Sequence, residues 1–233
     1  MAYNNNFDKL VYITNLLEKY NIEYWIDSGT LLGIMRDGKL LPNDKDIDIS
    51  IWEEGLSKID PFLKEVANSD YTITKNAYRG NVFLYSLIPN NNYDNQIIID
   101  LKIFAKSGSM IYCPSVVYRE IKYKQGTLPY RLVVLVNKLI YRMRLNKHIQ
   151  QYLREDRFPL SIVYRVATWY APSEYFKSFI RHPEYSFYIP EKWREYLVFR
   201  YGDWKKPVKK WDHRTDDGGY ANKTPNELLY GKQ

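Results

Sequence analysis

The sequence has few cysteines and few long apolar runs, the features that would indicate an oxidising compartment or a membrane. Its one cysteine, Cys113, cannot form an internal disulfide. The first residues lack the basic start and apolar run of a secretory signal. The longest purely apolar run, residues 132–136, is far shorter than the ~20 residues that span a bilayer. We therefore expect a soluble, cytoplasmic protein.

The chain has enough apolar residues for a sizeable core, and its charge is divided unevenly. It has 233 residues, of which 45% are hydrophobic, and this excludes a disordered tail or a disulfide-stapled miniprotein. Residues 1–100 carry 15 acidic and 9 basic side chains, whereas residues 101–233 carry 12 acidic and 25 basic ones. The net charge of +7 is therefore an average over unlike halves. A basic half indicates either an anionic partner or solvated helix surfaces.

The apolar spacing predicts an α+β fold whose sheet lies in the first half. We expect a helix over residues 7–17, strands over 22–26, 46–51, 71–75, 82–88, 96–104 and 111–123, and helices over 131–153, 160–170, 173–180 and 191–201. The predicted division is an α/β core over residues 1–115 and a mainly helical subdomain over residues 116–233, packed as one unit.

Three aspartates are placed where strands would bring them together. Asp46 and Asp48 alternate with isoleucines, so both side chains lie on one face of a strand, and Asp44 has the same parity. Asp100 lies inside a strongly apolar strand, where an unpaired carboxylate is costly. If the two strands are neighbours, the carboxylates converge, and hard oxygen ligands suit Mg²⁺ or Mn²⁺. The alternative for Asp46 and Asp48 is the solvated face of an amphipathic strand.

A glycine turn precedes the carboxylates. Ser28, Gly29 and Thr30 follow a predicted strand and precede a short helix over residues 31–36, where backbone N–H groups can bind phosphate. The order of strand, Gly-Thr turn, helix, Asp-x-Asp strand and later aspartate is that of the nucleotidyltransferase fold. We therefore predict a nucleotidyltransferase-like mixed sheet with flanking helices.

These segments resemble the LicD family, a group of nucleotidyltransferase-fold phosphotransferases related to fukutin-related protein. Residues 28–36 (SGTLLGIMR) and 41–49 (LPNDKDIDI) are similar to its signature helix and aspartate run. Residues 100–104 (DLKIF) look like its downstream strand, and residues 189–207 look like its closing block. Asn43 and Lys45 depart from the signature, which has Trp and Asp there. The Asp46/Asp48 pair is intact, so metal binding is expected to be kept. The departure bears on donor specificity instead.

The resemblance implies a metal-dependent enzyme that moves a phospho-alcohol from a CDP-activated donor to a glycan hydroxyl and releases CMP. The group transferred would be phosphocholine, or a polyol phosphate such as ribitol or glycerol phosphate. The implied catalytic and metal-binding residues are Asp46, Asp48 and Asp100. The implied substrate- and phosphate-binding residues are Ser28, Gly29, Thr30 and Arg36. For Arg36 the alternative is a charge that stabilises the end of its own helix.

Partners follow from the same resemblance. We expect a CDP-activated small molecule, a glycan or lipid-linked glycan acceptor, and peripheral contact of the basic half with the inner face of a membrane. Nucleic acid is not expected, because no nucleic-acid-binding motif accompanies the basic residues. Two other functions stay open: a nucleotidyltransferase that uses a nucleoside triphosphate, and a basic nucleic-acid-binding or inactive family member.

Overall fold

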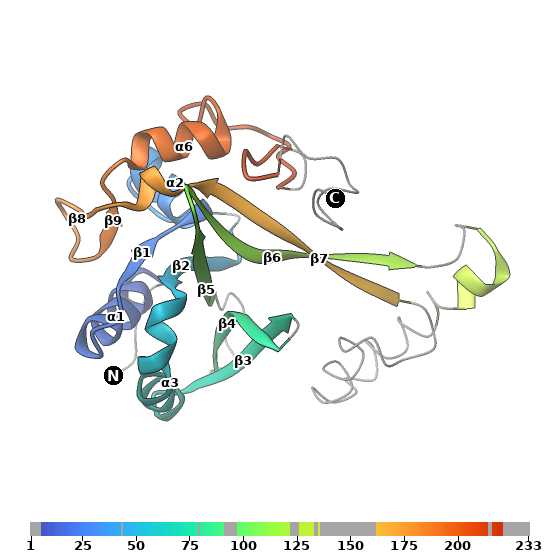
Figure 1. Ribbon diagram of the computed structural model, residues 1–233, viewed down its shortest axis with the longest axis horizontal. Helices are drawn as coiled ribbons and strands as arrows, with labels where there is room; N and C mark the ends of the chain where they lie inside the picture. Colours follow the sequence, from blue (N-terminus) through green and yellow to red (C-terminus); the bar gives the residue numbers. More distant parts are fainter. Residues whose placement is uncertain are drawn as a thin grey trace. The chain divides into compact units, whose positions relative to one another are not determined.

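The computed structural model describes residues 6–42, 44–78, 80–90, 97–121, 126–132, 135, 162–213 and 216–220 (Figure 1). The chain divides into two compact units, one formed by residues 1–115 and 168–224, the other by residues 116–167 and 225–233. Residues 168–224 thus belong to the same unit as residues 1–115, whereas the division predicted from the sequence falls at residue 115. The fold of this first unit positions the candidate site.

A mixed sheet runs through the first unit. Five strands lie in the order β1 (Tyr24–Ile26), β2 (Asp46–Trp52), β5 (Ile98–Ser107), β4 (Asn81–Pro89) and β3 (Tyr71–Tyr78). Strands β2 and β5 are parallel, whereas the pairs β1–β2, β5–β4 and β4–β3 are antiparallel. Strand β6 (Met110–Ile121) pairs with the end of β5 and with β7 (Ile162–Pro172). The parallel neighbours β2 and β5 are the strands predicted to carry the aspartates.

Helices lie on both sides of β1 and β2. Figure 1 shows α1 (Asn6–Lys19) and α3 (Ile59–Asn68) on one side, and α2 (Ser28–Asp37) and α6 (Trp193–Tyr201) on the other. Short elements complete the unit: the 3-10 helices η1 (Glu53–Lys58) and η2 (Ser173–Phe176), and a two-stranded sheet of β8 (Phe179–Arg181) and β9 (Tyr188–Pro190). None of the helices in the described ranges has the length and apolarity that crossing a membrane requires.

The core explains why β2 alternates. Ile47, Ile49 and Ile51 are fully buried, so the opposite parity is left for the aspartates. Trp25 on β1 is also fully buried, and its ring lies 4.7 Å from that of Trp52 at the end of β2. Burying the three isoleucines fixes the register of β2, because a one-residue slip would turn them to the polar face.

Two predicted helices were wrong. Residues 160–170 lie mostly in strand β7, and residues 173–180 form the 3-10 turn η2 and the start of β8. The stretch 162–168 (IVYRVAT) is rich in β-branched residues, which favour a pleated surface, and strand pairing outweighed the helical spacing. The helices predicted over 7–17 and 191–201 and the strands of the first half are confirmed. The helix predicted over 131–153 lies almost wholly outside the described residues.

Candidate active site

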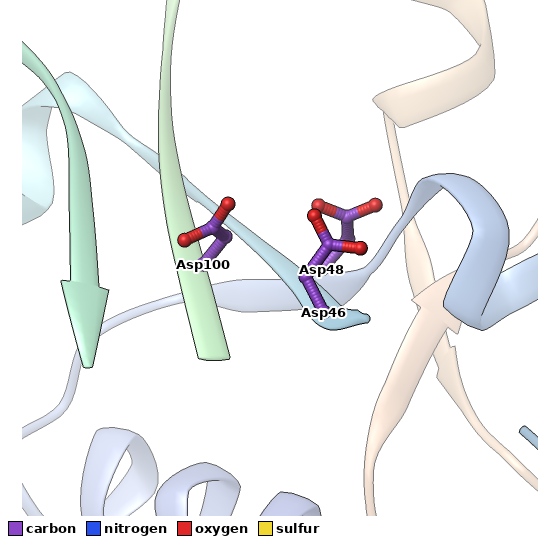
Figure 2. A group of neighbouring side chains, drawn as sticks. All are labelled: Asp46, Asp48 and Asp100. Atoms are coloured by element: carbon purple, nitrogen blue, oxygen red, sulfur yellow. The ribbon is translucent and has the colours of Figure 1, made fainter. Parts of the chain in front are cut away.

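The three predicted aspartates converge on one face of the sheet. Asp48 and Asp100 are direct partners in the parallel pair of β2 and β5, and Asp46 lies two residues before Asp48 on the same face. One carboxylate oxygen from each of the three lies within 4.8 Å of the others. Figure 2 shows the side chains projecting from the two adjacent strands toward the same space. The strand period and the register together produce this arrangement.

The cluster is partly buried. Asp48 is 7% exposed, and its Oδ1 faces Lys102 Nζ at 2.8 Å, whereas Oδ1 of Asp100 is buried without a hydrogen-bond partner. Burial raises the pKa of Asp100 to about 6; Ser86 opposes the shift, and the charges of Asp48 and Asp46 add to it. Burial also raises the pKa of Asp48, against the attraction of Lys102. Such a set of carboxylate oxygens fits a hard divalent cation.

The predicted phosphate turn is the first turn of helix α2. Helix α2 begins at Ser28, not at Leu31 as predicted, and Asp27 caps it by accepting a hydrogen bond from the Ser28 N–H at 2.6 Å. Ser28 has a left-handed φ of 52°, which turns the chain sharply from β1 into the helix. The hydroxyl of Thr30 accepts a hydrogen bond from the Asp48 N–H at 2.8 Å. The helix N-terminus is therefore tied directly to the aspartate strand.

Gly29 allows a fourth carboxylate to approach this helix. A Cβ atom on Gly29 would overlap Oδ2 of Asp44, so the Asp44 side chain packs against the first turn of α2. Burial and the charge of Asp46 raise the pKa of Asp44 to about 7. The acidic side of the site thus extends from Asp100 to the N-terminus of α2.

Lys102 was missed by the sequence analysis. It lies on β5 two residues after Asp100, and its Nζ is 2.8 Å from Asp48 Oδ1 and donates a hydrogen bond to Ser28 Oγ at 2.9 Å. The contact with Asp48 is an ion pair, and it places a positive charge against a buried carboxylate oxygen. Burial would lower the pKa of Lys102, but the charges of Asp48 and Asp27 and the contact with Asp48 together raise it. The alternation of β5, which places Asp100 and Lys102 on one face, is the signal that could have identified it.

A buried network behind the α2 N-terminus was missed as well. Arg200 on α6 contacts Asp217 at 2.8 Å and Asp27 at 3.3 Å. The Tyr196 hydroxyl donates to Asp27, and the Ser50 hydroxyl does so at 2.7 Å. Burial would raise the pKa of Asp27, but the charges of Arg200 and Lys102 and these hydrogen bonds hold it below its usual range. Residues of α6 therefore hold Asp27, the residue that caps α2, in place.

Arg36 lies away from this cluster. It is at the C-terminal end of α2, about 12 Å along the helix axis from Ser28 at ~1.5 Å per residue. Its guanidinium forms an ion pair with the neighbouring Asp37 at 2.8 Å. The role in charge stabilisation of the substrate stays a prediction, and so do the catalytic and metal-binding roles of the three aspartates.

A mixed sheet with two aspartates on one strand, a third on the parallel neighbour and a helix N-terminus beside them defines a nucleotidyltransferase-like fold. Comparison with known proteins shows which family this part of the chain is similar to. Residues 21–133 match the model of the family described as LicD/FKTN/FKRP, nucleotidyltransferase domain, and this confirms the LicD resemblance over that part of the chain.

Curated relatives share a short segment with this chain. An uncharacterized protein of Rickettsia prowazekii is 42% identical over 59 residues, which are 25% of this chain and 22% of the relative. Ribitol 5-phosphate transferase FKRP of Homo sapiens is 35% identical over 58 residues, 25% of this chain and 12% of the relative. The matched segment therefore spans less than a quarter of either relative.

Solved structures of the antibiotic-resistance factor ANT(2'')-Ia are also similar. Its solution structure matches with a TM-score of 0.31 and 16% identity, over 42% of this chain and 47% of that one. Its crystal structure in complex with adenylyl-2''-tobramycin matches with a TM-score of 0.32 and 15% identity, over 64% of this chain and 87% of that one.

Proposed function

We propose that the protein is a metal-dependent phosphotransferase that moves a phospho-alcohol from a CDP-activated donor to a glycan hydroxyl and releases CMP. The convergence of Asp46, Asp48 and Asp100 beside the N-terminus of α2 is the observation that carries the proposal. The family match and the similarity to a ribitol 5-phosphate transferase support phospho-alcohol transfer. Phosphocholine, ribitol phosphate and glycerol phosphate are the candidate groups.

The aspartates fit a divalent cation, for which Mg²⁺ or Mn²⁺ is the expected choice. Oδ1 of Asp100 is buried without a hydrogen-bond partner, Oδ1 of Asp48 is balanced by the ion pair with Lys102, and burial and the charge of Asp46 raise the pKa of both groups. A bound cation would supply the positive charge that neutralises the donor diphosphate and stabilises the leaving phosphate.

The residues of the chain then have distinct parts in the transfer. The N–H groups of Gly29 and Thr30, in the first turn of α2, bind phosphate oxygens of the donor. Asp100 accepts the proton of the acceptor hydroxyl. The hydroxyl oxygen forms a bond to the phosphorus that bears the alcohol, while the bond from that phosphorus to the bridging oxygen breaks and CMP leaves.

The decisive experiment identifies the leaving group. The protein is incubated with Mg²⁺, a panel of CDP-alcohols and nucleoside triphosphates, and candidate glycan acceptors. We expect CMP from a CDP-alcohol, and a loss of roughly a hundredfold or more in Asp100→Asn, which keeps the side-chain shape but removes the charge. Asp60→Asn, at an exposed position on α3, is the matched control and keeps wild-type turnover.

Other outcomes would contradict the proposal. Release of pyrophosphate from a nucleoside triphosphate would establish nucleotidyl transfer, the second candidate, which the description of the matched domain favours. Full activity of Asp100→Asn would exclude the carboxylate cluster as the catalytic centre. Binding of generic RNA that weakens steeply with salt, without turnover of any donor, would favour a nucleic-acid-binding role.

The acceptor is proposed to be a glycan or lipid-linked glycan reached at the inner face of a membrane. An exposed stretch after α6 supports contact with an anionic surface: it contains Lys205, Lys206, Lys209 and Lys210 together with exposed Val208 and Trp211. Clustered lysines with exposed apolar side chains are typical of peripheral attachment to anionic lipid.

A further inference from the structure

Lys102 occupies an unusual place for a cation. In the parallel pair of β2 and β5, Asp48 lies opposite Asp100, and the next residues on the same face, Ser50 and Lys102, lie opposite each other. The Lys102 side chain is 19% exposed. A lysine is thus built into the same face of the sheet as the proposed metal ligands.

Its ammonium group joins two parts of the site. Nζ is 2.8 Å from Asp48 Oδ1 and 2.9 Å from Ser28 Oγ. Ser28 begins α2 in the left-handed region, a backbone conformation that needs support from its surroundings. Lys102 therefore fixes the first turn of α2 relative to an aspartate of the cluster.

Arg200, a further buried cation near the N-terminus of α2, is engaged elsewhere. Arg200 contacts Asp217 and Asp27, each of which is fully buried. Asp48 therefore takes its ion pair from Lys102, and the positive charge of Lys102 lies within reach of any cation that Asp48 would bind.

We propose that Lys102 is a positioning residue that also keeps the donor-free site from binding a divalent cation tightly. The inference rests on the proposed function. The ammonium group attracts the same carboxylate as the cation and repels the cation itself, so it lowers cation affinity. The negative diphosphate of a donor offsets this repulsion, so donor and cation bind cooperatively.

Calorimetric titration of the donor-free protein with Mn²⁺ tests this proposal. In Lys102→Met we expect Mn²⁺ affinity to rise by roughly tenfold or more, because a nearby positive charge is removed. The KM for the donor is expected to rise by a similar factor, because Ser28 loses its support. Lys102→Arg keeps the charge and wild-type Mn²⁺ affinity. Lys106→Met, at an exposed position on the same strand, leaves both quantities unchanged.

The direction of the affinity change separates this role from a merely structural one. Loss of support alone would loosen the site and weaken Mn²⁺ binding, so unchanged or weaker binding in a folded Lys102→Met would overturn the proposal. If that variant does not fold, Lys102→Gln, which retains a hydrogen-bond donor without the charge, takes its place with the same expectation.

The result also distinguishes this proposal from the proposed function. Mn²⁺ binding by the wild type without tightening in the variant refutes the role of Lys102 alone. Binding by the variant and not by the wild type supports the role of Lys102, whatever the donor proves to be. Absence of binding in both refutes the metal site as well.

Discussion

Gly29 and Gly33 lie one turn apart on α2, yet a side chain at each would meet a different kind of neighbour. A Cβ atom on Gly29 would overlap the carboxylate of Asp44. A Cβ atom on Gly33 would lie 2.7 Å from the backbone oxygen of Lys39. A carboxylate can rotate away, whereas a packed backbone cannot, so the two glycines serve the site and the fold respectively.

Alanine at each position separates these roles. We expect Gly29→Ala to fold but to lose roughly tenfold in donor turnover, because Asp44 and the α2 N-terminus are displaced. Gly33→Ala is expected to lower the free energy of unfolding by about 1–3 kcal/mol, the usual cost of overpacking. Turnover and urea unfolding, measured on both variants, check this pair. Equal turnover in Gly29→Ala and the wild type would show that Asp44 and Gly29 are remote from the donor.

Helix α6 and residues 216–220 form one structural element around Arg200. Asp217 is fully buried and accepts hydrogen bonds from Arg200 Nε at 2.8 Å and from Trp169 Nε1 at 2.7 Å. Gly218 and Gly219 leave no room for a side chain, because their Cβ atoms would overlap Phe199 and Trp169. The segment is therefore packed against α6, and it holds the arginine that supports the cap of α2.

Removal of Arg200 tests this element. Arg200→Met removes the ion-pair partner of two buried carboxylates, which keep their other hydrogen bonds, so we expect a loss of about 3–5 kcal/mol in the free energy of unfolding. Asp217→Asn keeps an oxygen that can accept from Trp169 Nε1, but it places an NH2 donor toward Arg200 Nε and removes the charge, so it is also expected to destabilise the fold. Denaturant unfolding of both single variants and the double variant gives the coupling energy. Strictly additive losses would mean that Arg200 and Asp217 do not act as a pair.

The elements that sequence predicted best are those whose evidence is local. Alternation placed Asp46 and Asp48 on one face of β2, and the apolar run around Asp100 predicted a buried strand. Arg200 and Asp27 are 173 residues apart, and their pairing depends on how α6 packs. Strand β7 was mistaken for a helix because its partner β6 decides its conformation. Neither feature leaves a periodic signal in the sequence.

At the scale of the whole molecule, the acidic first half contains carboxyl groups whose ionised form is disfavoured in the folded state. The pKa is raised to about 7 for Asp44 and to about 6 for Asp100, from the ordinary 3.8. Between the ordinary value of 3.8 and these raised values, the folded protein binds more protons than the unfolded chain. This contribution to stability is therefore lost as pH rises. His182 acts oppositely, because burial lowers its pKa from 6.5 and its ionisation at low pH favours unfolding.

A divalent cation is expected to reverse the effect of the carboxylates, because it binds their ionised forms and competes with protons. Thermal unfolding at about pH 5 and about pH 8, each with and without Mg²⁺, checks this expectation. The increase in melting temperature on adding Mg²⁺ is expected to be larger at the higher pH. Because His182 lies outside the cluster, its contribution is the same with and without Mg²⁺ and cancels in that difference.

An Mg²⁺ effect independent of pH would mean that the cation binds away from Asp44, Asp46, Asp48 and Asp100. Asp100→Asn is the matched control, since loss of a ligand should reduce the Mg²⁺ effect at the higher pH while a cation bound elsewhere would leave it unchanged.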